Sequence, residues 1–181
     1  MPLVAVPLSP DHAVLTQDFE CEYPYITGYL CDPLRAYEDR KTGDTKTVLV
    51  IDEDNNRIAA YYSIKCSSLR IEEREADDTV TISIYPTVEI VMFAVDLRYR
   101  EMKVGTRTFA LIISSINELR QSVGIRAITL FSVPKAVKFY SESNFKTLSE
   151  GMDMYLHPSC EGCIPMYLVL PEIEFDDDCL I

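Results

Sequence analysis

Apolar residues recur along the chain at two spacings, one typical of strands and one typical of a helix. The segments 46–52 (KTVLVID) and 88–96 (VEIVMFAVD) are short, continuous and rich in valine and isoleucine, which predicts buried strands. Residues 57–71 are predicted to form a return strand after a polar turn at 53–56. Residues 106–123 carry apolar side chains at the spacing of an amphipathic helix. A strand, a loop and a long helix therefore follow one another near the centre of the sequence.

The remaining patterns complete an α/β domain. The other predicted elements are, in chain order, a helix over 26–40 that Pro33 interrupts, an acidic loop over 72–79, a strand over 127–132, a short helix over 134–143 that begins with proline, and strands near 152–156 and 164–170. Gly124 is expected to end the long helix. We expect a single domain over residues 1–170, with its core over 46–170, followed by an acidic tail over 171–181.

Length and composition are those of one globular domain. The chain has 181 residues, of which 48% are hydrophobic and 25% charged, which is an ordinary balance. No apolar run approaches the length of a membrane helix, and residues 1–10 lack the basic flank of a signal peptide. We therefore expect a cytoplasmic protein whose six cysteines are free thiols.

The net charge of −12 is concentrated in two short segments. Residues 72–78 (EEREADD) carry five acids and one arginine, and residues 172–178 (EIEFDDD) carry five acids, so together they account for −9. These segments are interpreted either as solvated surface or as an attraction for a cationic acceptor. Residues 98–107 hold four basic residues against one acid, a local positive cluster suited to an anionic ligand.

The loop over residues 100–106 (REMKVGT) opens the long predicted helix. The first turn of a helix presents backbone N–H groups that the helix does not use, and the helix dipole adds positive potential there. Such a turn suits a pyrophosphate, and Gly105 allows a ligand to approach the backbone closely. The alternative is an ordinary strand-to-helix loop with solvated charges.

This strand, loop and helix resemble the acetyl-CoA motif of the GNAT N-acetyltransferases. The family motif, Q/R-x-x-G-x-G/A, follows a strand that ends in A-V-D or a similar sequence. Here the strand ends in Ala94-Val95-Asp96, and Arg100 and Gly105 match the motif. Lys103 stands where the first glycine of the motif is expected, which indicates either a different turn with an extra phosphate contact or a weaker cofactor site.

Two further segments resemble this family. Residues 136–145 (AVKFYSESNF) resemble the pattern A-x-x-F-Y-x-x-x-G-F, with Asn144 in place of the glycine; asparagine also tolerates the left-handed conformation. Residues 89–95 (EIVMFAV) resemble the E-I-V-x-x-A-V strand of the histone-acetyltransferase branch. The resemblance implies that Tyr140 protonates the leaving thiolate and that Glu89 is the general base, because an ammonium group must lose a proton before it attacks a thioester.

The resemblance implies a GNAT fold, in which helices flank a mixed, mostly antiparallel sheet of six to seven strands around the central strand–loop–helix. It also implies acetyl-CoA as the cofactor and direct attack by the acceptor amine, with a backbone N–H of the strand meeting the developing oxyanion. The implied cofactor-binding residues are Phe93, Ala94, Val95, Arg100, Glu101, Met102, Lys103, Val104, Gly105 and Thr106.

The acceptor and the partners remain open at this point. The first hypothesis is a protein lysine, an N-terminal amine or a polyamine. The second follows from Phe19-Glu20-Cys21 and Tyr29-Leu30, which resemble the toxin branch of the family; those enzymes acetylate aminoacyl-tRNA beside an antitoxin. The third is a degenerate fold that binds CoA or a protein, as the residues Lys103 and Asn144 at glycine positions allow. Beyond tRNA, nucleic acid is not expected, and the oligomeric state is open, a dimer included.

A short cysteine motif is a candidate metal site. His157, Cys160 and Cys163 form H-x-x-C-x-x-C, and the nearest further candidate ligand is the distant Cys179. Because structural zinc prefers four ligands, we interpret this segment as a turn between two strands and predict no metal.

Overall fold

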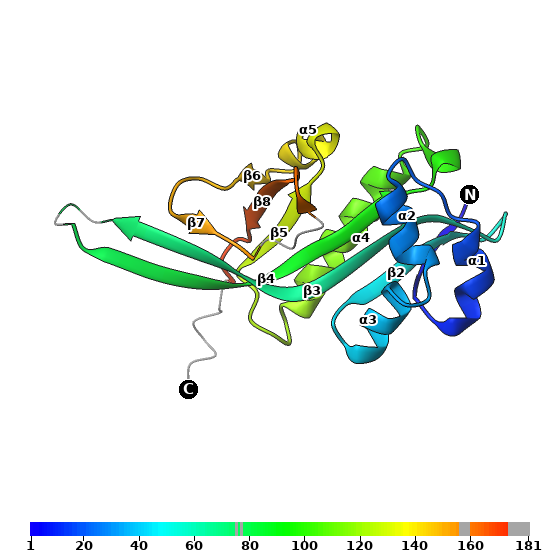
Figure 1. Cartoon of the computed structure of the whole chain (residues 1–181), viewed down its shortest axis with the longest axis horizontal. Helices are drawn as coiled ribbons and strands as arrows, with labels where there is room; N and C mark the ends of the chain where they lie inside the picture. Colours follow the sequence, from blue (N-terminus) through cyan, green and yellow to red (C-terminus); the bar gives the residue numbers. More distant parts are fainter. Residues whose placement is uncertain (75, 77, 156–159, 174–181) are drawn as a thin grey trace. The chain divides into compact units, whose positions relative to one another are not determined.

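Two long strands, β3 (Arg57–Arg74) and β4 (Val80–Val95), run through both of the units into which the chain divides (Figure 1). This computed structural model describes residues 1–74, 76, 78–155 and 160–173. The first unit consists of Met1–Ser67 and Val88–Gly124, and the second of Ser68–Thr87 and the residues from Ile125 onward. The described strands number eight, against the six to seven expected, in the predicted α/β class.

The strands of the first unit follow the order β1-β2-β3-β4. β1 (Leu3–Pro7) pairs antiparallel with β2 (Lys46–Asp52), and β2 pairs antiparallel with β3. β2 has the bounds predicted from its apolar run. β1 was not predicted, because its five residues end at a proline and give little periodicity.

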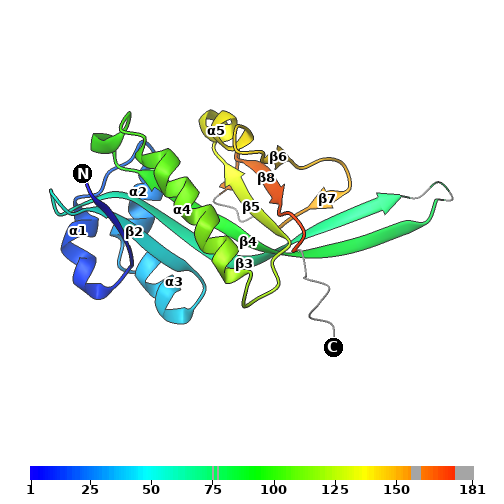
Figure 2. The same cartoon turned by 180° about the vertical axis from the view of Figure 1, so that it is seen from behind.

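Four α-helices belong to the first unit: α1 (Ala13–Gln17), α2 (Pro24–Cys31), α3 (Ala36–Thr42) and α4 (Val104–Leu119). The predicted interruption at Pro33 is confirmed, since α2 ends before this residue and α3 begins after it. In Figure 1 α1 to α3 lie in front of the strands of this unit, and in Figure 2, seen from behind, α4 lies in front. The helices therefore cover opposite faces of these strands.

Side chains that alternate along β2 supply one core to each face. Leu49 packs with Leu30 and Tyr61 in the cluster beneath α1 to α3. The next residue, Val50, packs in a second cluster with Val104, the first residue of α4. This alternation is what a strand buried on both faces requires, and it holds α4 firmly behind the end of β4.

The second unit contains β5 (Ala127–Ser132), a short 3₁₀ turn (Pro134–Ala136), α5 (Val137–Ser141), β6 (Lys146–Thr147), β7 (Met152–Asp153) and β8 (Ile164–Val169). β8 pairs antiparallel with β5 and with β6, and β7 pairs antiparallel with β3. Its core is formed by Leu69, Ile71 and Met154. The strand predicted near 152–156 is shorter than expected in its described part, and residues 156–159 lie outside the described residues.

Several predicted boundaries were wrong, among them the start of β4, which was expected at Val88. The acidic loop was expected over 72–79, but β3 continues to Arg74 and β4 begins at Val80. The long helix begins at Val104 and ends at Leu119, and a turn precedes Gly124, which therefore does not end the helix.

No helix among the described residues is both long and apolar enough to span a membrane. The predicted tail lies, from residue 174 onward, outside the described residues.

Candidate functional site

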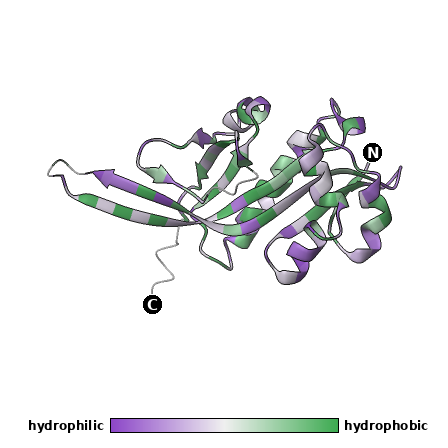
Figure 3. Ribbon diagram, in the orientation of Figure 1, coloured by the Kyte–Doolittle hydropathy of each residue, from purple (hydrophilic) through white to green (hydrophobic). Residues whose placement is uncertain are grey.

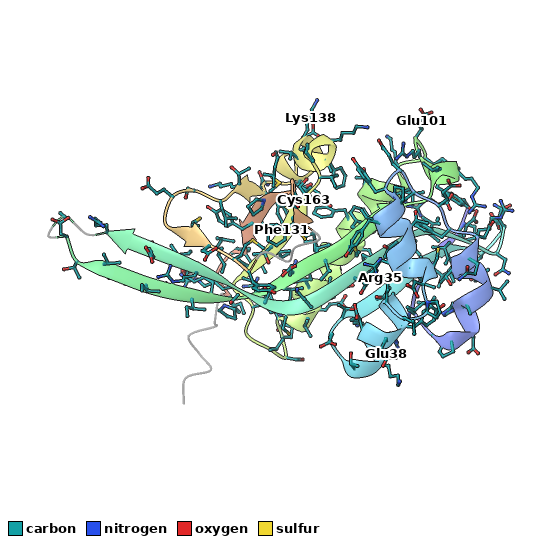
Figure 4. The ribbon with its side chains drawn as sticks, in the orientation of Figure 1. Arg35, Glu38, Glu101, Phe131, Lys138 and Cys163 are labelled. Carbon is teal, nitrogen blue, oxygen red and sulfur yellow. The ribbon has the colours of Figure 1, made fainter. Side chains whose placement is uncertain are left out.

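The loop between β4 and α4 makes a tight turn with two residues in the left-handed region. A 3₁₀ turn (Leu97–Tyr99) follows β4, and the N–H of Met102 donates to the carbonyl of Arg100 at 2.7 Å. Glu101 has φ 63° and Lys103 has φ 56°, and Lys103 is the residue that precedes the first turn of α4. Figure 4 shows the side chain of Glu101 pointing outward from this turn.

The backbone conformation of Lys103 shows what a lysine at this position of the motif costs. The left-handed region costs an L-residue about 1–2 kcal/mol, whereas glycine adopts it freely. Lys103 adopts φ 56° and ψ 18° at the position where the GNAT motif has its first glycine. Lys103 is therefore held in a left-handed turn at a cost in strain that a glycine at this position would not have.

The first turn of α4 leaves backbone N–H groups for a ligand. The first helical hydrogen bond runs from the N–H of Arg107 to the carbonyl of Lys103 at 3.1 Å. The amides of Val104, Gly105 and Thr106 precede it and lie at the positive end of a 16-residue helix. A Cβ on Gly105 would lie 3.4 Å from Cγ2 of Val95, so a small residue lets α4 start close to β4. Backbone donors, dipole and close approach together fit a pyrophosphate group.

Two of the basic residues in the predicted positive cluster already have acidic partners. An Nη atom of Arg100 lies 2.6 Å from a carboxylate oxygen of Glu22, and Arg98 pairs with both Asp96 and Asp18 at 2.7 Å. Burial raises the pKa of Asp96, but hydrogen bonds from Arg98 and from the backbone outweigh it and hold this pKa below its ordinary value. Arg98 therefore stabilises the loop through these ion pairs. The cluster is less positive than its sequence suggests.

Glu89 is buried in the first half of the β4 segment that belongs to the first unit. Its side chain is 5% exposed, and its Oε2 lies 3.5 Å from Nζ of Lys65 on β3. Further along β4, Phe93 packs against Phe109 of α4, with ring centroids 6.1 Å apart. The predicted strand therefore places a buried carboxylate and the start of α4 in the same unit.

Lys65 also lines a groove of about 620 Å³ on the first unit. The charged residues along this groove are Arg40, Asp44, Lys46 and Lys65, and Cys66 and Val88 lie beside them. Because Lys65 is paired with Glu89, Arg40 and Lys46 against Asp44 leave the groove only slightly positive, although the chain as a whole is acidic.

Tyr140 lies in the second unit, in the middle of an aromatic cluster on α5. Its ring contacts those of Phe139 and Phe145, with centroids 5.2 Å and 5.9 Å away. Burial raises the pKa of the Tyr140 hydroxyl well above its ordinary value, so the phenol keeps its proton at neutral pH. Asn144 has φ 66°, which confirms that it adopts the left-handed conformation of the glycine that it replaces.

Comparisons with known proteins identify the fold. No protein-family model matches the chain, and no curated protein matches it. Solved structures do match: a bacterial toxin has a TM-score of 0.72 at 18% identity, over 93% of this chain and 90% of that chain. The toxin AtaT complexed with acetyl-methionyl-tRNAfMet has a TM-score of 0.69 at 17% identity, over 88% of this chain and 98% of that chain. A mutant of AtaT bound to the C-terminus of the antitoxin AtaR and acetyl-CoA has a TM-score of 0.67 at 18% identity, over 88% and 96%. The chain has the GNAT fold.

This GNAT fold contains site-supporting residues that sequence reasoning missed. The N-terminal segment 18–22 is bonded to the loop: the N–H of Glu20 donates to Asp96 at 3.1 Å, and the N–H of Leu97 donates to the carbonyl of Glu20 at 2.9 Å. With the pairs made by Asp18 and Glu22, these bonds hold the loop from one side. No local motif signals them, because the partners are separated by 76 to 80 residues.

The cysteine motif forms a turn in its described part. The N–H of Cys163 donates to the carbonyl of Cys160 at 2.9 Å, and burial raises the pKa of the Cys163 thiol. His157 and Cys179 lie outside the described residues.

Proposed function

We propose that this chain transfers the acetyl group of acetyl-CoA to the amino group of an aminoacyl-tRNA. The observation that carries the proposal is the likeness to AtaT complexed with acetyl-methionyl-tRNAfMet, which extends over 88% of this chain and 98% of AtaT. This acceptor is the second of the hypotheses drawn from the sequence. It replaces a protein lysine or a polyamine as the preferred substrate.

The loop before α4 supports acetyl-CoA as the second substrate. Acetyl-CoA supplies an activated thioester and carries a pyrophosphate. The amides of Val104, Gly105 and Thr106 would hold that pyrophosphate, and the exposed cation Lys103 would add to the attraction. Residues 93–95 of β4 would bind the pantetheine arm through their backbone, as the resemblance implies. AtaT itself has been crystallised with acetyl-CoA.

The positive groove beside Glu89 favours a polyanionic acceptor. Arg40 and Lys46 would attract nucleic-acid phosphates and would repel a polyamine or a lysine-rich peptide. The acidic segments 72–78 and 172–178 had suggested a cationic acceptor. We assign these segments no role in binding the acceptor.

The two titratable groups would divide the proton transfers. Glu89 would take a proton from the acceptor ammonium, directly or through water, and Lys65 would orient its carboxylate. Tyr140, whose phenol is protonated at neutral pH, would give a proton to the leaving thiolate. AtaT and KacT have each been studied as tyrosine-to-phenylalanine mutants, which supports testing this tyrosine first.

The first experiment measures transfer of labelled acetyl from acetyl-CoA to aminoacylated tRNA, with a lysine peptide and spermidine as competing acceptors. We expect Tyr140→Phe to lower kcat by about 10²–10⁴-fold while CoA affinity, measured by calorimetry, is unchanged. Tyr155→Phe is the matched control, because Tyr155 is 71% exposed in the same unit. Transfer to the peptide or spermidine but not to tRNA would overturn the acceptor, and CoA binding without any transfer would favour a binding module.

A second experiment tests the groove. Arg40→Glu and Lys46→Glu should raise KM for aminoacyl-tRNA and weaken its salt dependence, while KM for acetyl-CoA stays unchanged. Lys41→Glu is the control, since Lys41 neighbours Arg40 on α3, pairs with Glu38 and does not line the groove. Equal effects of Lys41→Glu and Arg40→Glu would show that the charge of the chain matters and the groove does not.

A protein partner is also proposed. AtaT binds the C-terminus of the antitoxin AtaR. By likeness of fold, this chain would be held inactive by an antitoxin of its own. Co-expression with the adjacent reading frame, followed by co-purification and an acetylation assay, tests this, and an active co-purified complex would contradict it.

A further inference from the structure

The outer parts of β3 and β4 form a two-stranded arm of the second unit, residues 68–87, that is covered on one face. Leu69 and Ile71 of β3 are buried in the core of this unit, and Tyr85 of β4 packs against the same cluster. Strand alternation directs the neighbouring residues to the other face. There Val80, Ile82 and Ile84 are 47%, 53% and 68% exposed. We call these three residues the hairpin stripe.

The hairpin stripe reverses the usual placement of polar and apolar residues. In a strand with one buried face, the β-branched residues normally point to the core and the polar ones to water. In this arm, Thr81 and Ser83 alternate with the stripe, and Ser83 is half-buried on the same face as Tyr85, whereas Thr81 is exposed. Figure 3 shows the resulting alternation of hydropathy along this part of β4. Single exposed apolar residues are common, but a contiguous row of them on one face marks a surface that binds something.

The stripe ends at a strongly acidic turn. Residues 72–78 carry five acids and one arginine. Both arginines of this part of the arm contact acids of the arm itself: Arg70 contacts Glu72, and Arg74 lies 3.7 Å from Asp78. The segment 72–78 has a net charge of −4 by sequence, which suits a basic partner.

We infer that the hairpin stripe binds a basic, extended segment of a protein partner, with alternating apolar side chains on the stripe and lysines or arginines at the acidic turn. Charge disfavours the other occupants. A second copy of the chain would bring the same acidic segment, and the chain's own tail carries five acids over 172–178. Nucleic acid would be repelled as well. The inference does not depend on the proposed acetyl transfer.

The test uses the full chain and two synthetic peptides. In the probe peptide, valine alternates with threonine and lysines end the chain; in the control peptide, glutamates replace the lysines. Fluorescence anisotropy should show saturable binding of the lysine peptide and not of the glutamate peptide. Ile82→Ser with Ile84→Ser should weaken binding by about tenfold or more, because the buried apolar area falls. Glu73→Lys should weaken binding and reduce its salt dependence.

Matched controls keep the result specific to the stripe. Val14→Ser with Leu34→Ser removes two side chains that are as exposed as the stripe but belong to the first unit, and it should leave binding unchanged. Unfolding curves should be the same for both double variants, because each replaces exposed residues. Equal binding of the two peptides, or undiminished binding by the Ile82→Ser, Ile84→Ser variant, would overturn the inference. A dimer in sedimentation velocity that this variant dissociates would overturn it too, since the stripe would then bind a second copy.

Discussion

The left-handed conformation of Lys103 makes a quantitative prediction about two substitutions at one position. Lys103→Gly relieves a strain of about 1–2 kcal/mol, and the extra freedom of glycine in the unfolded chain offsets about 0.4–1 kcal/mol of that gain. Lys103→Ala loses the same charge and keeps the strain, since alanine has the same Cβ at φ 56°. The glycine variant should therefore be more stable than the alanine variant by about 1 kcal/mol.

Urea unfolding followed by circular dichroism measures this difference, and the midpoint should rise without a change in the m-value. Calorimetric titration with CoA separates a second effect, because both variants lose one exposed cation beside the candidate pyrophosphate site. Each should bind CoA less tightly, by up to about 1 kcal/mol or fivefold in Kd, and the loss should shrink as salt rises.

Asn144 supplies the internal control, since it has φ 66° but asparagine already tolerates this conformation. Asn144→Gly should gain less stability than Lys103→Gly, and Asn144→Ala should lose stability. Equal stabilities of the Gly and Ala variants at position 103 would refute the strained turn. Unchanged CoA affinity in both would refute a phosphate contact by Lys103.

Three further predictions concern residues of the first unit. Gly105→Ala should stabilise α4 by about 0.5–1 kcal/mol in urea unfolding, because its Cβ meets Val95 at an acceptable 3.4 Å. Asp96→Asn should lower the free energy of unfolding by about 3 kcal/mol near pH 7, because it breaks the buried pair with Arg98. Since the pKa of Asp96 is lowered in the folded protein, the stability that its carboxylate contributes is present above about pH 4 and is lost as pH falls further. Unfolding curves of the variant should lack that acid dependence. Burial raises the pKa of Tyr29 to about 12, so stability should fall by about 3 kcal/mol as pH rises from about 10 to 12, and Tyr29→Phe should remove that part of an alkaline unfolding titration.

Local patterns were enough to predict the centre of the fold. β2 and β5 have the predicted bounds, and α4 lies within two residues of its predicted start, because their apolar periodicity is strong. Position 103 is instructive, since the sequence showed a departure from glycine but not its conformation. A lysine gives no sign of a left-handed backbone until the turn around it is known.

The missed features depend on information that a local pattern lacks. Residues 80–85 (VTISIY) alternate as a strand does, but the acidic run before them suggested a loop, and β4 was predicted to begin at Val88. The bonds of Asp18, Glu20 and Glu22 to the loop connect residues far apart in sequence. Each of these acids looks like ordinary surface charge until the fold brings it to its partner.

The bonds between the N-terminal segment 18–22 and the loop after β4 have a thermodynamic consequence. Each favours one arrangement of the loop, so a ligand that prefers that arrangement also stabilises the segment, and the coupling is reciprocal. A fusion, a cleavage or a bound protein that displaces the segment therefore lowers the affinity of the loop for its ligand. Bound ligand makes displacement of the segment less favourable by the same factor. The ends of this linkage are the segment 18–22, whose Phe19 and Cys21 are buried in the core, and the turn before α4, so events at one can be measured at the other.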